Sequence, residues 1–283
     1  MTDSSSRVRV AAVQMVSKAH VDDNLRDSQQ LIAEAARNGA RLIVLPEYFC
    51  LMGMTDSDKV AIREADGDGP IQRFLAQQAR EHGIWLVGGT VPLVSPQQDR
   101  MLNSTLVYGP DGKRVARYDK IHLFAFSRGK ENYDEARTIF PGSRTTAFEL
   151  TPEAGTTLKV GLSICYDLRF PELYRALGRP DLILVPAAFT ATTGRAHWET
   201  LLRARAIENL CYVLAAAQGG RHQNGRATFG HSMLIDPWGT VVASRDEGAG
   251  VVIGDIDTQL IAQMRTDLPA LQHRRIQDSG FRI

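Results

Sequence analysis

The sequence predicts an α/β fold in which helices cover a central sheet on at least one face. Short runs rich in Val, Ile and Leu alternate along the chain with stretches of helical spacing. The run Arg41–Pro46 is nearly all apolar, which is typical of a strand buried on both faces. Glycine or proline ends several of these segments. This alternation of strand and helix favours α/β over an all-helical or all-strand protein.

Three strands and two helices are expected in the first third of the chain. The strands are predicted at Val8–Met15, Arg41–Pro46 and Ile84–Val91, and the helices at Asp22–Asn38 and Pro70–His82. Gly39 and Gly83 follow the two helices, and glycine is the residue most often found just past a helix C-terminus.

The middle of the chain has a different pattern. Ser104–Tyr108 and Arg114–Tyr118 flank the turn signal Gly109-Pro110-Asp111-Gly112, which predicts a β-hairpin. Phe124–Gly142 is polar with little periodicity and is interpreted as a long loop. Loops of that length are often functional.

The second half repeats the alternation of strands and helices. Strands are predicted at Leu158–Cys165, Asp181–Pro186, Cys211–Ala217, Gly230–Asp236 and Gly250–Ile256, and a helix at Gly194–Asn209. Since neither a flexible linker nor a fixed-period repeat divides the chain, residues 1–283 are expected to form a single domain. The basic, polar stretch from about Gln272 is expected to be a C-terminal tail, either extended or packed on a partner subunit.

Composition excludes several classes of protein. The 283 residues carry a formal net charge of +1, which gives no support for nucleic acid or a membrane surface as the main partner. No stretch approaches the roughly 20 apolar residues of a membrane span. The three cysteines cannot all pair, and Met1–Arg7 lacks the apolar core of a signal peptide. A cytoplasmic location is therefore expected.

Three reactive side chains stand where predicted strands give way to loops. Glu47 ends the run Leu42–Pro46, Lys120 follows Tyr118-Asp119, and Cys165 closes the strand Leu158–Cys165. A thiol needs a nearby base or cation to become a nucleophile, and a fixed ammonium can stabilise an oxyanion. Taken singly, each residue also has an ordinary interpretation, which is packing for the cysteine and a solvated charge for the other two.

Other chemistries lack a matching pattern. Cys50 and Cys211 lie in apolar surroundings and are interpreted as packing residues, as are His122, His197 and His231. Neither HExxH nor CxxC occurs, so no metal is expected. The serine elbow Gly-x-Ser-x-Gly, the Walker loop and GxGxxG are also missing, and no cofactor is implied.

Together, the three signatures resemble the nitrilase, or carbon–nitrogen hydrolase, superfamily. The residues that carry the resemblance are Leu45-Pro46-Glu47, Tyr118-Asp119-Lys120-Ile121-His122 and Ser163-Ile164-Cys165-Tyr166-Asp167, in the family's order. The similarity extends from Val10-Ala11-Ala12-Val13-Gln14-Met15 to Asp236-Pro237-Trp238-Gly239. It implies a four-layer αββα sandwich that pairs with a second copy into a homodimer or a higher homo-oligomer.

The resemblance also implies roles. Glu47 corresponds to the general base, Lys120 to the lysine that stabilises the oxyanion, and Cys165 to the nucleophile that forms a thioester. The backbone N–H of Tyr166 would complete the oxyanion hole. The family's second glutamate fits Glu135 best, with Glu131 as the weaker candidate.

Two further segments indicate a branch of the superfamily. Phe189–Gly194 with Ala196-His197-Trp198-Glu199 is similar to amidases acting on ω-amides of 2-oxo acids, and Ala215–His222 with Gly230-His231-Ser232 is closer to deaminated-glutathione amidases. The substrate implied is a small anionic amide, deaminated glutathione, cleaved to 2-oxoglutarate and cysteinylglycine. Arg169 is a candidate for binding its anionic groups, and Phe189 and Thr190 are candidates for lining the pocket.

Alternatives remain open at the level of the sequence. One is an ω-amidase acting on 2-oxoglutaramate, or a hydrolase of another small amide or carbamoyl amine. Another is a redox protein that uses Cys165 as a reversible sensor, which would leave Glu47 and Lys120 only the task of tuning the thiol. The third is a non-catalytic binding protein with the same fold, against which the presence of all three reactive residues counts.

Overall fold

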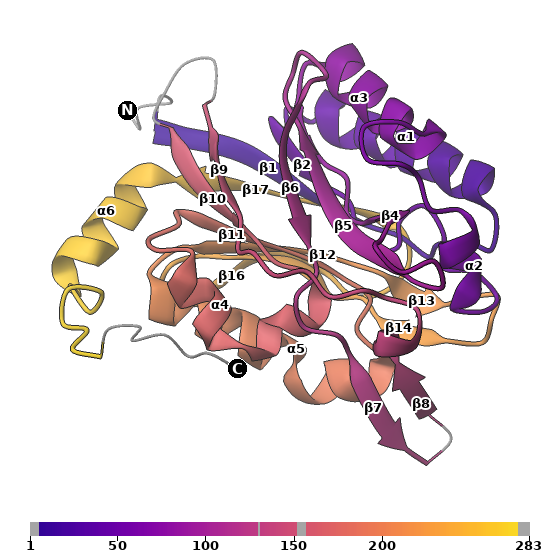
Figure 1. Cartoon of the computed structure of the whole chain (residues 1–283). Coiled ribbons are helices and arrows are strands. Elements are labelled where there is room, and N and C mark those ends of the chain that lie inside the picture. Colours follow the sequence, from indigo (N-terminus) through magenta and orange to yellow (C-terminus); the bar gives the residue numbers. More distant parts are fainter. Residues whose placement is uncertain (1–5, 130, 152–156, 277–283) are drawn as a thin grey trace.

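The computed structural model describes residues 6–129, 131–151 and 157–276, and it places two large β-sheets face to face between layers of helices. Helices α1 and α3 lie outside the first sheet, and α4 and α5 lie outside the second (Figure 1). This arrangement confirms the predicted α/β class and the αββα sandwich.

The first sheet has seven strands, with neighbours in the order β17-β1-β2-β3-β5-β4 and with β6 paired to β5. Its strands are β1 (Arg7–Gln14), β2 (Leu42–Val44), β3 (Trp85–Val87), β4 (Val91–Val94), β5 (Met101–Tyr108), β6 (Arg114–Asp119) and β17 (Gly250–Asp257). Strands β1, β2 and β3 are parallel, whereas β17 joins β1 antiparallel. The C-terminal part of the chain therefore completes a sheet built by the N-terminal part.

The second sheet has six strands in the order β16-β15-β12-β11-β10-β9. These are β9 (Ala147–Leu150), β10 (Leu158–Leu162), β11 (Leu182–Ala187), β12 (Tyr212–Ala217), β15 (Ser232–Ile235) and β16 (Val241–Arg245). Strands β10, β11 and β12 are parallel and almost wholly buried, as their apolar sequences predict.

Helices and short ribbons complete the described structure. The helices are α1 (Val21–Arg37), α2 (Ser57–Ala61), α3 (Pro70–His82), α4 (Pro171–Ala176), α5 (Ala191–Asn209) and α6 (Thr258–Asp267), with 3₁₀ turns η2 (Glu135–Arg137) and η3 (Cys165–Arg169). Two separate ribbons are β7 (Ala125–Arg128) with β8 (Glu131–Asp134), and β13 (Gly219–Arg221) with β14 (Ala227–Phe229).

Alternation along β1 explains how the layers hold together. Val10 and Ala12 belong to the apolar core between the two sheets, whereas Ala11 and Val13 belong to the core beneath α1 and α3. Successive side chains of a strand point to opposite faces, so one strand contributes to both cores. The alignment of the two sheets leaves the ends of β2, β6 and β10 in position to contribute to one site.

The structure corrects several predicted boundaries. The strand predicted at Ile84–Val91 ends at Val87, because Gly88-Gly89 turns the chain and Gly89 adopts φ +49° against the carbonyl oxygen of Pro46. The strand predicted at Leu158–Cys165 ends at Leu162, and Cys165 instead begins η3. The helix predicted at Gly194–Asn209 begins at Ala191, where the Thr190 hydroxyl accepts a hydrogen bond from the Thr193 N–H and caps it.

The prediction of a long loop at Phe124–Gly142 was wrong in part, since this segment contains the β7–β8 hairpin and η2. The ring of Phe124 lies 6.1 Å from that of Phe126 and 5.8 Å from that of Tyr133, so aromatic contacts support this ribbon. Its other side chains are largely exposed, which is why the sequence lacks a core-facing periodicity.

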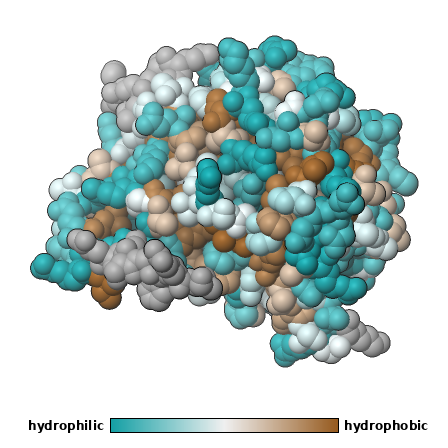
Figure 2. Space-filling view, viewed as in Figure 1, coloured by the Kyte–Doolittle hydropathy of each residue, from teal (hydrophilic) through white to brown (hydrophobic). Residues whose placement is uncertain are grey.

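Hydrophilic side chains cover most of the face seen in Figure 2, and hydrophobic ones form separate patches among them. None of the helices in the described ranges is long and apolar enough to cross a membrane. The predicted basic tail is described only as far as Ile276, and its last residues, 277–283, lie outside the described residues.

Candidate active site

Glu47 lies just after β2 with its side chain 1% exposed. Its Oε1 accepts a hydrogen bond from Asn103 Nδ2 at 3.0 Å, and its Oε2 accepts one from the Ala188 N–H at 2.9 Å. Asn103 belongs to the first sheet, and Ala188 directly follows β11 of the second. The carboxylate is therefore fixed from both sheets at once.

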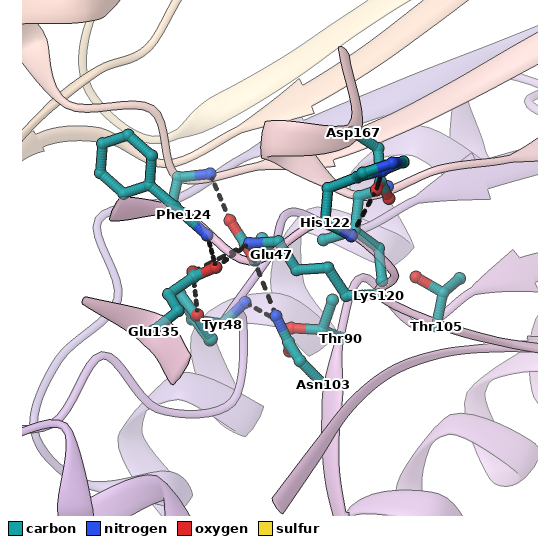
Figure 3. A network of polar contacts seen from close by, with 12 residues as sticks. Glu47, Tyr48, Thr90, Asn103, Thr105, Lys120, His122, Phe124, Glu135 and Asp167 are labelled. Carbon is teal, nitrogen blue, oxygen red and sulfur yellow. Dashed lines mark hydrogen bonds and ion pairs between the residues drawn. The ribbon is translucent and has the colours of Figure 1, made fainter. Parts of the chain in front are cut away.

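Lys120 directly follows β6 and is fully buried. Its Nζ donates to Glu47 Oε1 at 2.9 Å and to Glu135 Oε1 at 2.8 Å, so the ammonium lies between two carboxylates (Figure 3). Burial alone would lower the pKa of Lys120, but Glu135 and Glu47 outweigh it, and the net shift of the pKa is upward. The lysine is a permanent cation at this site.

Glu135 begins η2 at the foot of the β7–β8 hairpin. Besides Lys120, its carboxylate accepts hydrogen bonds from the Tyr48 hydroxyl at 2.9 Å and from the Phe124 N–H at 2.7 Å (Figure 3). Glu131, the weaker candidate for this position, instead accepts a hydrogen bond from the Thr192 hydroxyl at 2.5 Å. Of the two, only Glu135 contacts Lys120.

Cys165 stands at the first residue of η3, 7% exposed, in the left-handed conformation with φ +48°. Such a backbone is strained for a residue with a side chain, and strain of this kind recurs at functional sites. Burial raises the pKa of its thiol well above the usual value, the charge of Glu47 raises it further, and Lys120 lowers it. The resting thiol is therefore protonated at neutral pH and needs a base before it can attack.

A small inner pocket opens above the thiol. Residues that line it include Glu135, Cys165, Tyr166, Phe189, Thr190 and Arg226. Its volume of about 10 Å³ admits little more than one water molecule. Phe189 and Thr190 thus lie where the sequence predicted pocket-lining residues, and Thr190 also caps α5. Tyr166 is the second residue of η3. The N–H groups of the first residues of a helix lack an acceptor within that helix.

Arg169 contacts two residues that line this pocket. Its guanidinium packs over the rings of Tyr166 and Phe189, 5.7 and 5.5 Å from their centroids, and its Nη1 is 3.3 Å from His197 Nδ1. Arg169 is not among the residues that line this pocket. Direct binding of substrate by Arg169 stays a prediction.

Asp167 connects the nucleophile loop to the loop that follows Lys120. Its fully buried carboxylate accepts hydrogen bonds from the Ile164 N–H at 2.8 Å, the Tyr118 hydroxyl at 2.7 Å and the His122 N–H at 3.1 Å. Its Oδ1 also lies 2.7 Å from His122 Nδ1 (Figure 3). His122 was predicted only to pack, and no role was predicted for Asp167.

Sequence analysis assigned no role to four residues at the site. They are Tyr48, Asn103, Asp167 and Arg226. The position of Tyr48 beside Glu47 was a usable signal, whereas Asn103 lies inside a strand and Arg226 follows a turn, without a motif of their own. Among residues 6–129, 131–151 and 157–276, no three His, Cys, Asp or Glu side chains gather as metal ligands.

The geometry can be compared with known proteins. Residues 9–266 match the family described as carbon–nitrogen hydrolase. The deaminated glutathione amidase of Synechocystis sp. is 41% identical over 268 residues, covering 93% of this chain and 97% of that protein. The human deaminated glutathione amidase is 42% identical over 272 residues, covering 94% of this chain and 82% of that protein.

Solved structures agree with this assignment. Saccharomyces cerevisiae Nit3, a member of branch 10 of the nitrilase superfamily, superposes with a TM-score of 0.85 at 30% identity, over 96% of this chain and 97% of its own. A mutant amidase from Nesterenkonia sp. AN1 has a TM-score of 0.78 at 25% identity, over 97% of this chain and 96% of its own, and carries the acetamide moiety of fluoroacetamide covalently on its active-site cysteine.

A family match over most of the chain, relatives at about 40% identity and the αββα fold lead to one conclusion: the chain belongs to the carbon–nitrogen hydrolase family of the nitrilase superfamily, and it is a hydrolase that acts on amides.

Proposed function

We propose that this protein is a cysteine-dependent amidase that hydrolyses deaminated glutathione to 2-oxoglutarate and cysteinylglycine through a thioester. The observation that carries the proposal is the buried ammonium of Lys120. It is held between Glu47 and Glu135, and its charge lowers the pKa of the Cys165 thiol. Acyl transfer by a thiol requires a base and a cation close to the sulfur, and the charges of Glu47 and Lys120 both act on the Cys165 thiol.

The first step begins with a protonated thiol. Glu47 takes the Sγ proton while the sulfur forms a bond to the amide carbonyl carbon, and the carbonyl π electrons move to oxygen. Because burial raises the pKa of Cys165, proton transfer and attack are expected to be concerted, without a standing thiolate.

The tetrahedral oxyanion then needs stabilisation. Lys120 supplies a fixed positive charge, and the backbone N–H of Tyr166 supplies a hydrogen bond. Glu135, which holds Lys120 through a second ion pair, keeps the ammonium in place as Glu47 is protonated. When the intermediate collapses, the C–N bond breaks and the nitrogen takes the proton from Glu47.

Hydrolysis of the thioester repeats the chemistry with water. Glu47 removes a proton from water as the oxygen bonds to the acyl carbon. The C–S bond then breaks, and the departing sulfur recovers the proton from Glu47. The enzyme returns to its resting state with a carboxylic acid released, and the atoms balance without a cofactor.

Several parts of the proposal depend on relatives. The substrate is supported by deaminated glutathione amidases at 41–42% identity that match over most of this chain. A cytoplasmic location is supported by three free, buried cysteines. We also include a homodimer or a higher homo-oligomer, an arrangement supported only by the family resemblance.

A kinetic comparison tests the function. We expect kcat/KM for deaminated glutathione to exceed that for 2-oxoglutaramate, and intact mass spectrometry of the quenched reaction to detect an acyl adduct on Cys165. Faster turnover of 2-oxoglutaramate would make the protein an ω-amidase. No turnover of any amide, together with a sulfenate on Cys165 after mild oxidant, would favour the redox alternative, although a buried thiol with a raised pKa is poorly suited to sensing.

A further inference from the structure

A larger outer cavity adjoins the inner pocket above Cys165. Its volume is about 460 Å³, within the usual range for small-molecule sites. Lys59, Tyr133 and Arg226 line it, and Arg226 also lines the inner pocket. A substrate that reaches Cys165 from this cavity would therefore pass the Arg226 side chain.

Arg226 has unused hydrogen-bonding capacity. Its Nη2 donates to the Ala188 carbonyl at 2.8 Å, and its guanidinium lies 5.1 Å from the centroid of the Tyr133 ring. Its Nε is buried and has no hydrogen-bond partner among the described residues. A buried donor without an acceptor is unfavourable, and an anionic ligand in the pocket would supply that acceptor.

Lys59 is a second basic residue beside the same cavity, and it is buried. Its side chain is 6% exposed, and its Nζ lies 4.8 Å from the centroid of the Tyr48 ring. The acid nearest to it, Asp56, is 3.4 Å away but has a side chain 67% exposed, so this ion pair is weak. Lys59 and Arg226 repel one another electrostatically and line the outer cavity together. Two positive charges in one cavity, one of them on a buried side chain, favour an anionic ligand.

We propose that Arg226 and Lys59 form an anion subsite that binds the carboxylate on the acyl part of the substrate. This inference rests on the proposed function and narrows it to monoamides of dicarboxylic acids. Arg226 would hold the carboxylate by hydrogen bonds, since it lines the pocket with Cys165, and Lys59 would add positive charge from the outer cavity. An extended five-carbon acyl chain places its carboxylate about 5 Å from the reacting carbon by ordinary bond lengths.

Tyr48 connects this subsite to the reacting groups. Its hydroxyl donates to Glu135, the partner of Lys120, while the face of its ring lies beneath Lys59. Lys59 therefore packs against the same residue that holds the second glutamate. The anionic end and the amide end of one substrate would be oriented by a continuous set of contacts.

The test separates acyl from leaving-group binding. In the Cys165→Ala protein, calorimetry measures the Kd of 2-oxoglutarate, the acyl product, and of cysteinylglycine, the leaving group. We expect Arg226→Gln to weaken 2-oxoglutarate binding about 10- to 100-fold and Lys59→Met to weaken it less, with little change for cysteinylglycine. Arg221→Gln is the matched control, because Arg221 is an exposed arginine of the neighbouring β13 strand that lines neither cavity.

Three results would overturn the subsite. They are no measurable binding of 2-oxoglutarate to Cys165→Ala, equal binding by the Arg226→Gln protein, and a loss confined to cysteinylglycine. Thermal melts check that each variant is folded. Turnover of deaminated glutathione by the unaltered protein is measured separately. If it is absent while Arg226→Gln still weakens 2-oxoglutarate binding, the proposed substrate fails and the subsite stands.

Discussion

Asp167 and His122 meet with 2.7 Å between Oδ1 and Nδ1, and this contact joins the two loops that carry Cys165 and Lys120. Asp167 is two residues past the nucleophile, and His122 is two residues past the lysine. The ring of His122 stacks on Phe170 at 3.7 Å, which fixes it from the other side. The separation between thiol and ammonium is therefore set by neighbours of both residues.

Asp167→Asn should lower kcat at least 10-fold with a smaller change in KM, because one amide oxygen cannot replace both carboxylate oxygens and the loops would shift. The buried unpaired donors should also cost about 1–3 kcal/mol in the free energy of unfolding. Steady-state kinetics and urea denaturation measure the two effects. Asp181→Asn is the control. Asp181 accepts a hydrogen bond of 2.8 Å from Arg265 in a region away from the site, so this variant should lose stability but keep its kcat. An unchanged kcat in Asp167→Asn would show that Asp167 does not position these loops.

Cys165→Ala should be folded but inactive, because the sulfur that forms the thioester is gone and the lost volume is small. Circular dichroism and turnover of deaminated glutathione measure these outcomes. Cys211→Ala is a matched control, since Cys211 is a buried cysteine too but lies outside the pocket, and this variant should keep its activity. Full amidase activity in Cys165→Ala would eliminate the thioester mechanism.

Lys120→Met should lower kcat on the order of 100- to 1000-fold, as expected for the loss of one oxyanion-stabilising group. It should also destabilise the fold by about 3–5 kcal/mol, because Glu47 and Glu135 would share a buried site without a cation. Guanidinium denaturation measures the second effect. Adding Glu135→Gln to Lys120→Met should restore part of the stability and none of the activity. A double variant that regains activity but no stability would contradict the role of the ion pairs.

His222 should make the fold less stable as pH falls from about 6.5 to 4. Burial lowers the pKa of His222 to about 4, whereas the unfolded chain has a pKa near 6.5. Between these values the unfolded state binds the proton that the folded state does not, so the contribution is present above pH 6.5 and lost on acidification. The loss should approach about 3 kcal/mol, at 1.36 kcal/mol for each pKa unit. Denaturation at several pH values measures the free energy of unfolding. Its dependence on pH should be weaker in His222→Gln than in the unaltered protein, and an equal dependence would remove His222 as the cause.

Arg169→Glu should raise KM for anionic amides more than for neutral ones of the same length, if the charge of Arg169 attracts the substrate. Its packing over Phe189, a pocket residue, gives a second route to an effect through the pocket wall. That route would raise KM for both classes equally. Kinetics with 2-oxoglutaramate and the neutral five-carbon amide valeramide separate the two, and an equal rise in KM would remove Arg169 from substrate recognition.

The buried strands and the places of Glu47, Lys120 and Cys165 in the fold were predictable because their signals are local. Strand β11 is a continuous apolar run, and Glu47, Lys120 and Cys165 each stand directly after such a run or beside one. By contrast, α6 buries only Ile261, so its sequence carries little helical periodicity, and the helix was not predicted. The β7–β8 hairpin was missed for the same reason, since its exposed side chains follow no core.

The rest of the site depends on contacts across the fold. Arg226 reaches the pocket from the β13–β14 ribbon, more than 170 residues after Glu47 and Tyr48 in the chain. Asn103 belongs to an ordinary buried strand, and only the position of Glu47 gives its amide a function. Such residues have no pattern that a single sequence can reveal, because the chemistry arises from tertiary packing.

Because hydrogen bonds from both sheets hold Glu47, the rate of turnover depends on how the two sheets pack against one another. Asn103 and Ala188 hold the carboxylate from opposite halves of the sandwich, so any slippage between the halves would spoil proton transfer before secondary structure is lost. In mild denaturant, activity should therefore fade ahead of the far-ultraviolet signal. A simple colorimetric assay could then rank variants by the integrity of their interior, including those altered far from the pocket.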